Sequence, residues 1–483
     1  MSNYSDKYEA VIGLEVHAQL LTKSKLFCGD AASFGAEPNM HVSPITLAHP
    51  GTLPKMNKEA IELAVRMGLV CNCEIESKNY FARKHYFYPD LPKGYQLSQH
   101  TTPVCKGGFV KIKMGDTERT IQLNRIHLEE DAGKSMHDQH DLYSVVDYNR
   151  AGVPLIEIVT EPDLHSGDEA AAYVTEIRKL VRTLNVCDGN MEEGSLRCDA
   201  NISIRLKGAT QLGTKVEIKN LNSIRFLKKA IDFEVMRMIE IKDKGEEVMQ
   251  QTRGFNPANE TTFAIRTKED ANDYRYFADP DLPPFFITEE FIQTIREALP
   301  ELPEEKKQRF ILQFSLTEYD AVLLCEDKEL ADYFEATAAQ ISSFKQAANW
   351  LLGPVKSVMK EEGEEIGQLS VEPHQLAELI KLVEDGKVSY TIAAQKLFPA
   401  MLKQRNASAI ELAQQLNLIQ ERNEDALQQL IDEVLNNMPD KVNEYKKGKK
   451  GLIGLFVGEV MKKSKGKADP KLLNQLVTEK LSN

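Results

Sequence analysis

Residues 199–206 read DANISIRL and residues 213–219 read GTKVEIK, and apolar and polar side chains alternate along both stretches. This alternation is typical of a strand with one buried face, because successive side chains of a strand point to opposite sides of the sheet. Residues 12–16 and 125–130 show the same pattern. The first 300 or so residues therefore contain several half-buried β-strands.

Two longer stretches of this region show helical spacing instead. Apolar residues recur every three to four positions over 166–185, and 220–244 shows a second helical stretch. The residues that could cap these helices are Ser166 or Asp168 for the first and Asn220 or Asn222 for the second. Because strands and helices do not alternate as βαβ units, we expect an α+β fold with a largely antiparallel sheet.

The composition changes twice along the chain. Two prolines followed by acidic and then basic residues near Pro300 are typical of a helix start after a linker. From there on the pattern is helical, with a second break at residues 403–407. We therefore predict a sheet domain at 1–298, an all-helical domain at 299–405 and a small all-helical tail domain at 406–483. The tail helices are expected at 408–416, 423–438, 452–463 and 469–481.

The bulk composition is that of an ordinary globular protein. The chain has 483 residues, of which 42% are apolar and 28% charged. No apolar run approaches the roughly 20 residues that a membrane span needs, and the first residues do not resemble a secretion signal. Seven cysteines, an odd number, argue against a disulfide framework. We therefore expect a cytoplasmic protein with no membrane partner.

The charge is uneven. The net charge of −13 argues against nucleic-acid binding over the whole surface. Between residues 440 and 467, however, nine lysines stand against three acidic residues. Two interpretations stay open on composition alone, a solvated lysine-rich tail and a nucleic-acid contact. The lysines are 441, 446, 447, 449, 450, 462, 463, 465 and 467.

The predicted strands carry an unusual number of charged residues on one face. Glu15 and His17 are two positions apart and so share a face, and RIHLEE at 125–130 adds a histidine and paired acids. A single polar face is more often solvated than functional. Several such faces in one domain favour a polar cavity, because a sheet must bury one of its sides. The other two sets are Arg197, Asp199, Asn201 and Ser203, and Lys215, Glu217 and Lys219.

Carboxylates with an occasional imidazole and no thiolate suit Mg²⁺ or Mn²⁺, which prefer oxygen ligands. Mg²⁺ commonly bridges phosphate oxygens, so the pattern favours phosphoryl transfer with cations nearby to offset phosphate charge. Lys84 and Arg197 are candidates, although Lys84 alone could be an ordinary surface lysine. The sequence has no G-x-x-x-x-G-K-[ST] loop, no dinucleotide G-x-G-x-x-G motif and no amidase Ser–Lys signature.

Long segments resemble the B subunit of the aspartyl/glutamyl-tRNA amidotransferase family. They include VIGLEVHAQL from residue 11, RKHYFYPDLPKGYQLSQ from 83, RIHLEEDAGKS from 125 and MEEGSLRCDANIS from 191. The similarity runs in order through residues 10–285 and resumes in the tail. It implies a cradle domain similar to the glutamine synthetase and guanidino kinase fold, followed by a helical domain and a tail that contacts tRNA.

The resemblance also implies a ligase reaction shared by three different subunits. The family uses ATP and Mg²⁺ to phosphorylate the side-chain carboxylate of Glu on tRNA-Gln or Asp on tRNA-Asn. Ammonia, released from glutamine by the amidase (A) subunit, then displaces the phosphate, and the C subunit ties the other two together. This division of work explains the missing amidase signature. Which of the two misacylated tRNAs is the substrate stays open at this point.

Site residues are transferred from the matching motifs. Carboxylates and one histidine are expected to hold metal, at Glu15, His17, Glu130, Asp199 and Glu217. Catalytic roles are expected for Glu130, Lys84, Arg197, Glu129 and Glu157. ATP is expected to contact Lys84, Arg197 and Lys215.

One segment departs from the family pattern. Many members carry a four-cysteine zinc cluster near the N-terminus, whereas the corresponding residues here are Cys28, Asp30, Ser43 and Thr46. One thiolate cannot form a structural tetrahedral zinc site. We therefore expect no zinc and a packed Cys28. Cys71 and Cys73 form a C-x-C pair without a second pair, and we expect both to be structural.

Two other classes of function are compatible with parts of the pattern. A free-standing Mg²⁺ phosphotransferase acting on a small carboxylate would explain the acidic faces but not the basic tail. A non-catalytic tRNA scaffold would explain the tail but not the acidic faces on several strands. In the tail, Gly448, Gly451, Gly454 and Gly458 interrupt an apolar segment, and we expect close backbone contacts there to compensate for the cost of helix glycines.

The tail hypothesis makes a direct prediction. Deletion of residues 406–483 should weaken tRNA binding, and the loss should shrink as salt is raised, because lysine–phosphate contacts are screened. Binding titrations at two salt concentrations measure both effects. The activity of the glutaminase partner serves as the control and should not change. Unchanged tRNA affinity would contradict a nucleic-acid role for the tail.

Overall fold

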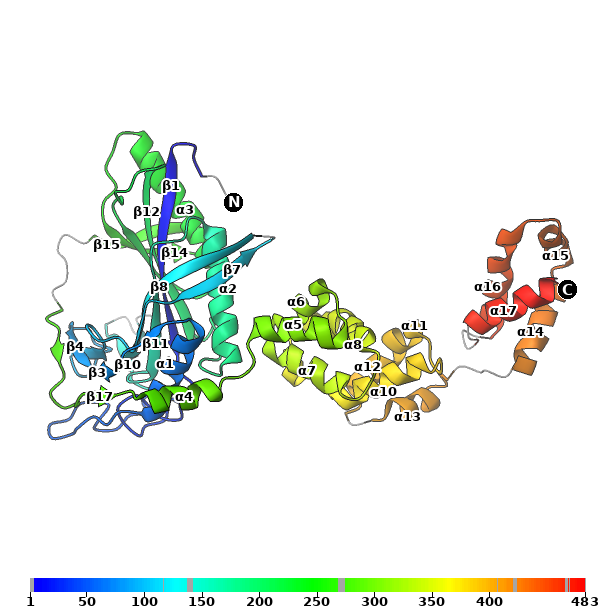
Figure 1. Ribbon diagram of the computed structural model, residues 1–483, viewed down its shortest axis with the longest axis horizontal. Helices are drawn as coiled ribbons and strands as arrows, with labels where there is room; N and C mark the ends of the chain where they lie inside the picture. The colour runs from blue at the N-terminus through cyan, green and yellow to red at the C-terminus, as the bar shows by residue number, and fades with distance from the viewer. Residues whose placement is uncertain are drawn as a thin grey trace. The chain divides into compact units, whose positions relative to one another are not determined.

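We describe the protein from a computed structural model (Figure 1). The structure describes residues 4–115, 117–136, 142–267, 274–405, 407–419, 424–464, 468 and 470–482. The tail lysines 465 and 467 therefore lie outside the described residues. The chain divides into two compact units, Met1–Leu302 and Pro303–Asn483, close to the first predicted boundary.

The first unit is built on one large sheet, as an α+β fold requires, and its strand pairs are antiparallel except for β13 with β14. The predicted strands at 12–16, 125–130 and 199–206 lie in it, and the one predicted at 213–219 lies in it from Val216 onward. In order across the sheet the strands are β15 (Thr261–Thr267), β14 (Gln251–Asn256), β13 (Val216–Leu221), β12 (Leu196–Leu206), β1 (Tyr8–Gln19), β11 (Pro154–Thr160), β8 (Thr117–Glu130), β5 (Tyr95–Ser98), β4 (Ala82–His85) and β16 (Phe277–Ala278).

Shorter strands complete this unit. Strands β6 (Cys105–Lys106) and β7 (Phe109–Met114) pair with β8, and β2 (Glu74–Ile75) pairs with β6. Two pairs are separate: β9 (Lys134–Met136) with β10 (Val145–Asp147), and β3 (Lys78–Asn79) with β17 (Phe285–Phe286). The helices of the unit are α1 (Lys58–Val70), α2 (Gly167–Thr183), α3 (Ile224–Asp243) and α4 (Glu289–Glu297).

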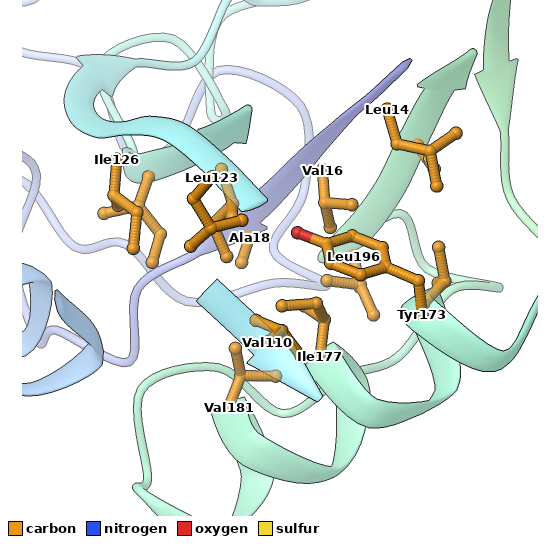
Figure 2. Close-up of a cluster of buried hydrophobic side chains, with 14 of the residues drawn as sticks. Leu14, Val16, Ala18, Val110, Leu123, Ile126, Tyr173, Ile177, Val181 and Leu196 are labelled. Atoms are coloured by element: carbon orange, nitrogen blue, oxygen red, sulfur yellow. The ribbon is translucent and has the colours of Figure 1, made fainter. Parts of the chain in front are cut away.

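One face of the central strands forms the hydrophobic core. Leu14, Val16 and Ala18 of β1 are fully buried, and α2 places Tyr173 and Ile177 against them (Figure 2). Side chains from α1 and α3 belong to the same cluster, so the helices cover this side of the sheet. The odd-numbered residues of β1 necessarily face the other side.

The helix predictions hold with one correction. Ser166 caps α2, since its hydroxyl accepts a hydrogen bond from the backbone N–H of Glu169 at 3.1 Å. The second helix does not start at Asn220 or Asn222. β13 continues to Leu221, and α3 begins at Ile224 after Ser223. Alternation along 216–221 extends the strand into the region where we expected the cap.

The second unit is helical throughout its described residues and contains two separate hydrophobic clusters. The first cluster surrounds Trp350, which contacts Phe398. It contains α5 (Pro303–Phe314), α6 (Glu318–Cys325), α7 (Lys328–Ala338), α8 (Phe344–Trp350), the π-helix Leu351–Val355, α9 (Lys356–Glu362), the 3₁₀ turn Ile366–Gln368, α10 (Pro373–Glu384), α11 (Tyr390–Ile392), the π-helix Ala393–Leu397, α12 (Phe398–Lys403) and α13 (Ala409–Gln415).

The second cluster is the tail, centred on Ile431 and Phe456. Helix α15 was not predicted, while the other three tail helices match the predicted positions to within about two residues. The tail contains α14 (Glu424–Asn436), α15 (Pro439–Lys446), the 3₁₀ turn Lys450–Leu452, α16 (Ile453–Lys463) and α17 (Pro470–Ser482).

The packing shifts the boundary of the tail. Helix α13, which we assigned to the tail, packs with the first cluster through Ala409 and Leu412. The carboxylate of Glu378 on α10 accepts hydrogen bonds from the Ser408 hydroxyl at 2.6 Å and the Ala409 N–H at 2.9 Å. The two clusters are therefore divided after α13 rather than at residue 405.

The glycines of the tail also differ from expectation. We expected close backbone contacts at these positions. Among the described residues, no atom lies within 4 Å of a Cβ built at Gly451, Gly454 or Gly458, and the same holds for Gly448, whose φ of +110° favours glycine. Within the described part of the tail, the glycines leave open surface rather than a helix–helix contact.

This boundary can be tested with two truncations. A chain ending at residue 405 loses the buried side chains of α13, and we expect its first helical cluster to be less stable by about 2 kcal/mol or more. A chain ending at residue 419 should keep the stability of the full chain. Trp350 is the only tryptophan and lies in this cluster, so its fluorescence during urea unfolding reports on it. Equal midpoints for the two truncations would place α13 outside the cluster. The shorter deletion is also the better reagent for the tRNA experiment.

Candidate functional site

The face of the sheet opposite the core carries a polar cavity of about 770 Å³. Its floor is fixed by strand register. His17 of β1 pairs with Glu157 of β11 on one side and with Arg197 of β12 on the other, and Glu157 pairs in turn with His127 of β8. Four antiparallel strands therefore place four ionisable side chains in one row on one face. Glu15 and Asp199 pair in the next row on this face, and Glu217 lies one row further, opposite Asn201.

One acidic group lies along this row. A ligand atom from each of His17, Glu129 and Glu157 lies within 4.8 Å of the others. The Nε2 atom of His17 is 3.5 Å from Glu157 Oε2 and 3.8 Å from Glu129 Oε1. His127 Nε2 approaches the same two carboxylates at 3.5 and 3.7 Å. Two imidazoles and two carboxylates thus converge on one point.

The protonation of this group follows from its surroundings. Burial by itself lowers the pKa of His17, but the hydrogen bond and charge of Glu157 outweigh burial, so the pKa is raised. Burial raises the pKa of Glu157, but His127, His17 and Lys84 together hold it well below its usual range. Glu157 is therefore a carboxylate at neutral pH, with His17, His127 and Lys84 around it.

A second acidic group lies one row away. Ligand atoms of Glu15, Asp199 and Glu217 lie within 4.8 Å of one another. Glu15 and Asp199 are register partners on β1 and β12. The amine of Lys219 is 2.9 Å from both Asp199 Oδ2 and Glu217 Oε1. Asn201 donates a hydrogen bond to Glu15 Oε1 at 2.9 Å.

A β-bulge shapes this second group. The pairing of β12 with β13 shifts between Cys198 and Ala200, so two residues of β13 lie opposite Asp199. Those residues are Lys219 and Asn220. The Lys219 amine bonds to one carboxylate oxygen of Asp199, and the Asn220 N–H donates to the other at 2.8 Å. The bulge therefore directs both donors at one carboxylate.

Two further cations line the cavity. Among the described residues, Lys84 of β4 forms no ion pair within 4.0 Å, and its amine lies 5.1 Å from the centre of the Tyr274 ring. Burial by itself lowers the pKa of Lys84, but the nearby charges, above all that of Glu129, outweigh burial. The pKa is therefore raised and the amine is charged. Arg197 instead binds Asp131 through both terminal nitrogens, at 3.1 and 3.2 Å. Lys84 is the freer of the two cations.

Glu130 lies apart from the other predicted metal ligands. We expected it to hold metal with the other acids, but it follows Glu129 on β8 and so faces the opposite side of the strand. Its carboxylate accepts a hydrogen bond from the Leu97 N–H at 2.8 Å and pairs with Lys93. It lines a separate cavity of about 240 Å³. Glu130 therefore belongs to neither acidic group.

Lys215 is also placed elsewhere. It precedes β13 and lines a separate hollow of about 230 Å³ with Gly13 and Ser203, while Lys219 takes the position by the carboxylates. Sequence reasoning named Lys219 only as part of a polar face and gave His127 no role in the site. The sequence did contain a sign of both, because each lies two positions from an acidic residue on its own strand and so shares a face with it. No sequence pattern pointed to Asp131, the partner of Arg197.

Both acidic groups suit a hard divalent cation. Each offers at least two carboxylates, which Mg²⁺ and Mn²⁺ prefer, and neither contains a thiolate. The Nδ1 atom of His17 is buried without a hydrogen-bond partner among the described residues, while Nε2 faces the carboxylates. This orientation presents a ring nitrogen as a ligand. The residues present therefore fit magnesium.

The four positions of the absent zinc cluster do come together. The Cys28 thiol is 3.3 Å from Asp30 Oδ2 and 3.4 Å from the Thr46 hydroxyl, and the Ser43 N–H donates to the same Asp30 oxygen at 2.9 Å. Burial raises the pKa of the Cys28 thiol. One protonated thiol and a carboxylate that already accepts these bonds do not fit structural zinc. A hydrogen-bonded network holds this loop instead.

Comparison with known proteins gives one consistent result. Residues 10–293 match the family model described as the GatB/GatE catalytic domain, and residues 332–481 match the GatB domain. The B subunit of the aspartyl/glutamyl-tRNA(Asn/Gln) amidotransferase from Thermodesulfovibrio yellowstonii is 48% identical over 471 residues, which cover 98% of each chain. The proteins of the same name from Thermoanaerobacter sp. and Bdellovibrio bacteriovorus are 48% and 45% identical, over 99% and 98% of this chain.

The crowding of carboxylates leads to a stability prediction. Burial, with the charges of Glu157 and Asp199, raises the pKa of Glu15. The folded state then holds more protons than the unfolded state above the usual carboxyl pKa, so stability falls as the pH rises through the raised value. Without divalent metal, Glu15→Gln should therefore have a higher Tm than the parent at pH 7.5.

The advantage of Glu15→Gln should shrink as the pH is lowered, since Glu15 then becomes protonated in the parent as well. Thermal unfolding at pH 7.5 and 5.5 measures it. The exposed Glu246→Gln is the matched control and should change neither value. A lower Tm for Glu15→Gln at pH 7.5 would show that the charge of Glu15 is not repelled in the folded protein.

Proposed function

The chain belongs to the family of B subunits of the aspartyl/glutamyl-tRNA(Asn/Gln) amidotransferases, and we propose that its polar cavity activates a carboxylate carried on tRNA. These enzymes are glutamine-hydrolysing ligases. The observation that carries the proposal is the pairing of two acidic groups with an unpaired lysine in one cavity. That combination suits the transfer of a phosphoryl group to a carboxylate.

The proposed reaction has two steps. An oxygen of the side-chain carboxylate of Glu on tRNA-Gln, or Asp on tRNA-Asn, attacks the γ-phosphorus of ATP, and ADP leaves. Ammonia then attacks the acyl carbon and inorganic phosphate leaves, which gives the amide. The first step joins two anions, so it needs positive charge around both.

We assign the charged residues to this need. Mg²⁺ would be held by His17, Glu129 and Glu157 and by Glu15, Asp199 and Glu217, where it would offset the charge of the phosphate oxygens. Lys84 supplies a cation for phosphate, because no carboxylate among the described residues pairs with it. Arg197 and Asp131 fix each other through two hydrogen bonds and so keep the floor of the cavity in place.

The ammonia comes from elsewhere. No amidase Ser–Lys signature is present in the sequence. We therefore propose that the glutaminase (A) subunit of the amidotransferase supplies ammonia and that its C subunit completes the complex. The names of the relatives include both aspartyl and glutamyl substrates.

The tail is proposed as the tRNA contact. Helix α16 carries Gly454 and Gly458 with open space around them and ends at Lys462 and Lys463. A glycine surface lets a sugar–phosphate backbone approach closely, and lysines contact phosphates without reading bases. The tail combines both features on an otherwise acidic chain.

The fold type of the sheet unit and the cellular location of the protein are also part of the proposal. We propose that the sheet unit is a cradle of the glutamine synthetase and guanidino kinase type, since a largely antiparallel sheet carries the acidic face. No described helix is long and apolar enough to cross a membrane. All seven cysteines are free thiols, which suits the reducing cytoplasm that we propose as its location.

The other two classes of function are not favoured. A free-standing phosphotransferase would not need the helical region, tail included, that the second family model matches at residues 332–481. A tRNA scaffold would have no use for two partly buried acidic groups, whose like charges oppose folding.

The metal assignment is tested in the complex of all three proteins. Asp199→Asn and Glu157→Gln should each lower ATP-dependent amide formation on misacylated tRNA at least about 100-fold, because charge stabilisation of phosphoryl transfer is lost. Both should also raise the Mg²⁺ concentration that gives half-maximal rate. tRNA binding should not change. Near-normal rates and Mg²⁺ dependence in both variants would remove the site from this cavity.

Two lysine variants test whether Lys219, as the structure suggests, or Lys215, as the sequence predicted, acts in the cavity. Lys219→Met leaves Asp199 and Glu217 without their cation and should lower the rate about tenfold or more. Lys215→Met lies outside the cavity and should keep the rate within about twofold of the parent. The same amidation assay measures both. A loss at Lys215 with normal activity at Lys219 would restore the sequence-based assignment.

A further inference from the structure

Two aromatic rings at the polar cavity have an exposure that folding does not explain. Phe87 is 93% exposed and Tyr88 is 53% exposed, yet both line the cavity. Burying a phenylalanine side chain stabilises a fold, and this chain forgoes that gain at Phe87. Single exposed apolar residues are common on protein surfaces. Two adjacent rings at the rim of a charged cavity are a more specific arrangement.

The loop that carries these rings is held in place by its backbone. The Leu91 N–H donates to the Tyr88 carbonyl at 3.0 Å, and the Gly94 N–H donates to the Leu91 carbonyl at 3.1 Å. The Tyr148 hydroxyl donates to the Pro89 carbonyl at 2.8 Å. The rings are therefore presented from a fixed loop rather than from a loose one.

The Phe87 ring lies beside Gly94. A Cβ atom at Gly94 would lie 3.4 Å from Cε1 of Phe87, so a side chain at this position would touch the ring, and glycine leaves it uncovered. Gly94 has a φ of +74°, which itself favours glycine. With 93% of the side chain exposed, the rest of the ring is open to a ligand.

Other aromatic residues of the cavity already have partners. His100 and Tyr276 stack at 4.0 Å with an interplanar angle of 5°, and Tyr274 contacts both Tyr276 and the Lys84 amine. Among the described residues, no aromatic ring lies against Phe87 or Tyr88. Phe87 and Tyr88 are thus the described phenylalanine and tyrosine residues of the cavity whose rings have no aromatic neighbour.

We propose that Phe87, with Tyr88 beside it, stacks an adenine base at the mouth of the cavity. The inference rests on the proposed function, because both substrates of that reaction carry adenine: ATP as its base, and tRNA as its 3′-terminal nucleotide. A planar base stacks on an aromatic side chain without sequence-specific hydrogen bonds, which suits a phenylalanine. The charged floor then receives the phosphate and carboxylate groups.

A fluorescence experiment detects the stacked base directly. Phe87→Trp keeps a ring and adds a reporter to a chain whose only tryptophan is Trp350. Taking the difference between the variant and parent complexes removes the other tryptophans. Quenching by Mg·ATP assigns the base to ATP. Quenching by uncharged tRNA, and none by the same tRNA lacking its terminal adenosine, assigns the base to tRNA.

Kinetics give an independent readout. Phe87→Leu keeps apolar volume but removes the ring, and we expect it to raise KM for the stacked substrate about tenfold with little change in kcat. Phe87→Tyr keeps the ring and should restore the parent KM. Phe286→Leu is the control, because Phe286 is 68% exposed but does not line the cavity.

The proposal fails under two results. One is the absence of quenching by both ligands together with unchanged KM values in Phe87→Leu. The other is a loss of co-purifying partner proteins in Phe87→Leu at unchanged KM, which would make the ring a contact within the complex. The fluorescence readout needs no turnover, so it separates failure of this inference from failure of the proposed reaction.

Discussion

The antiparallel register of four central strands is the constraint on which the site depends. His127, Glu157, His17 and Arg197 come from four strands far apart in sequence, and pairing places them in one row. A slip of one residue in any strand would turn its charged side chain into the core and its apolar neighbours into the cavity. The packing of α2 against Leu14, Val16 and Ala18 therefore also fixes the position of the ionisable residues.

The folded protein bears an electrostatic cost at this site. Carboxylates from five strands share one cavity, and their proximity raises the pKa of Glu15, whereas cationic neighbours lower that of Glu157. The apolar face on the other side of the same strands offsets the repulsion. Lys219 reduces it locally. The groups that oppose folding are those that suit a divalent cation.

Adjacent residues on one strand serve different cavities. Glu129 belongs to the polar cavity, whereas Glu130 faces the smaller one and pairs with Lys93. Asp131 lines both cavities and is held by Arg197. Residues 129–131, at the end of β8 and just after it, therefore line two cavities on opposite sides of the strand. The nucleic-acid contact that we propose lies on the tail, which has a separate hydrophobic cluster of its own.

The sequence by itself determined the fold class, the helical second half and most of the acidic residues that line the polar cavity. Period-two alternation reports which side chains share a face, and this property is local. Only the tertiary structure decided which faces meet. It separated Glu130 from Glu129, replaced Lys215 by Lys219 through a bulge opposite Asp199, and moved α13 out of the tail. Register, bulges and helix packing depend on contacts between distant segments, which a local pattern does not contain.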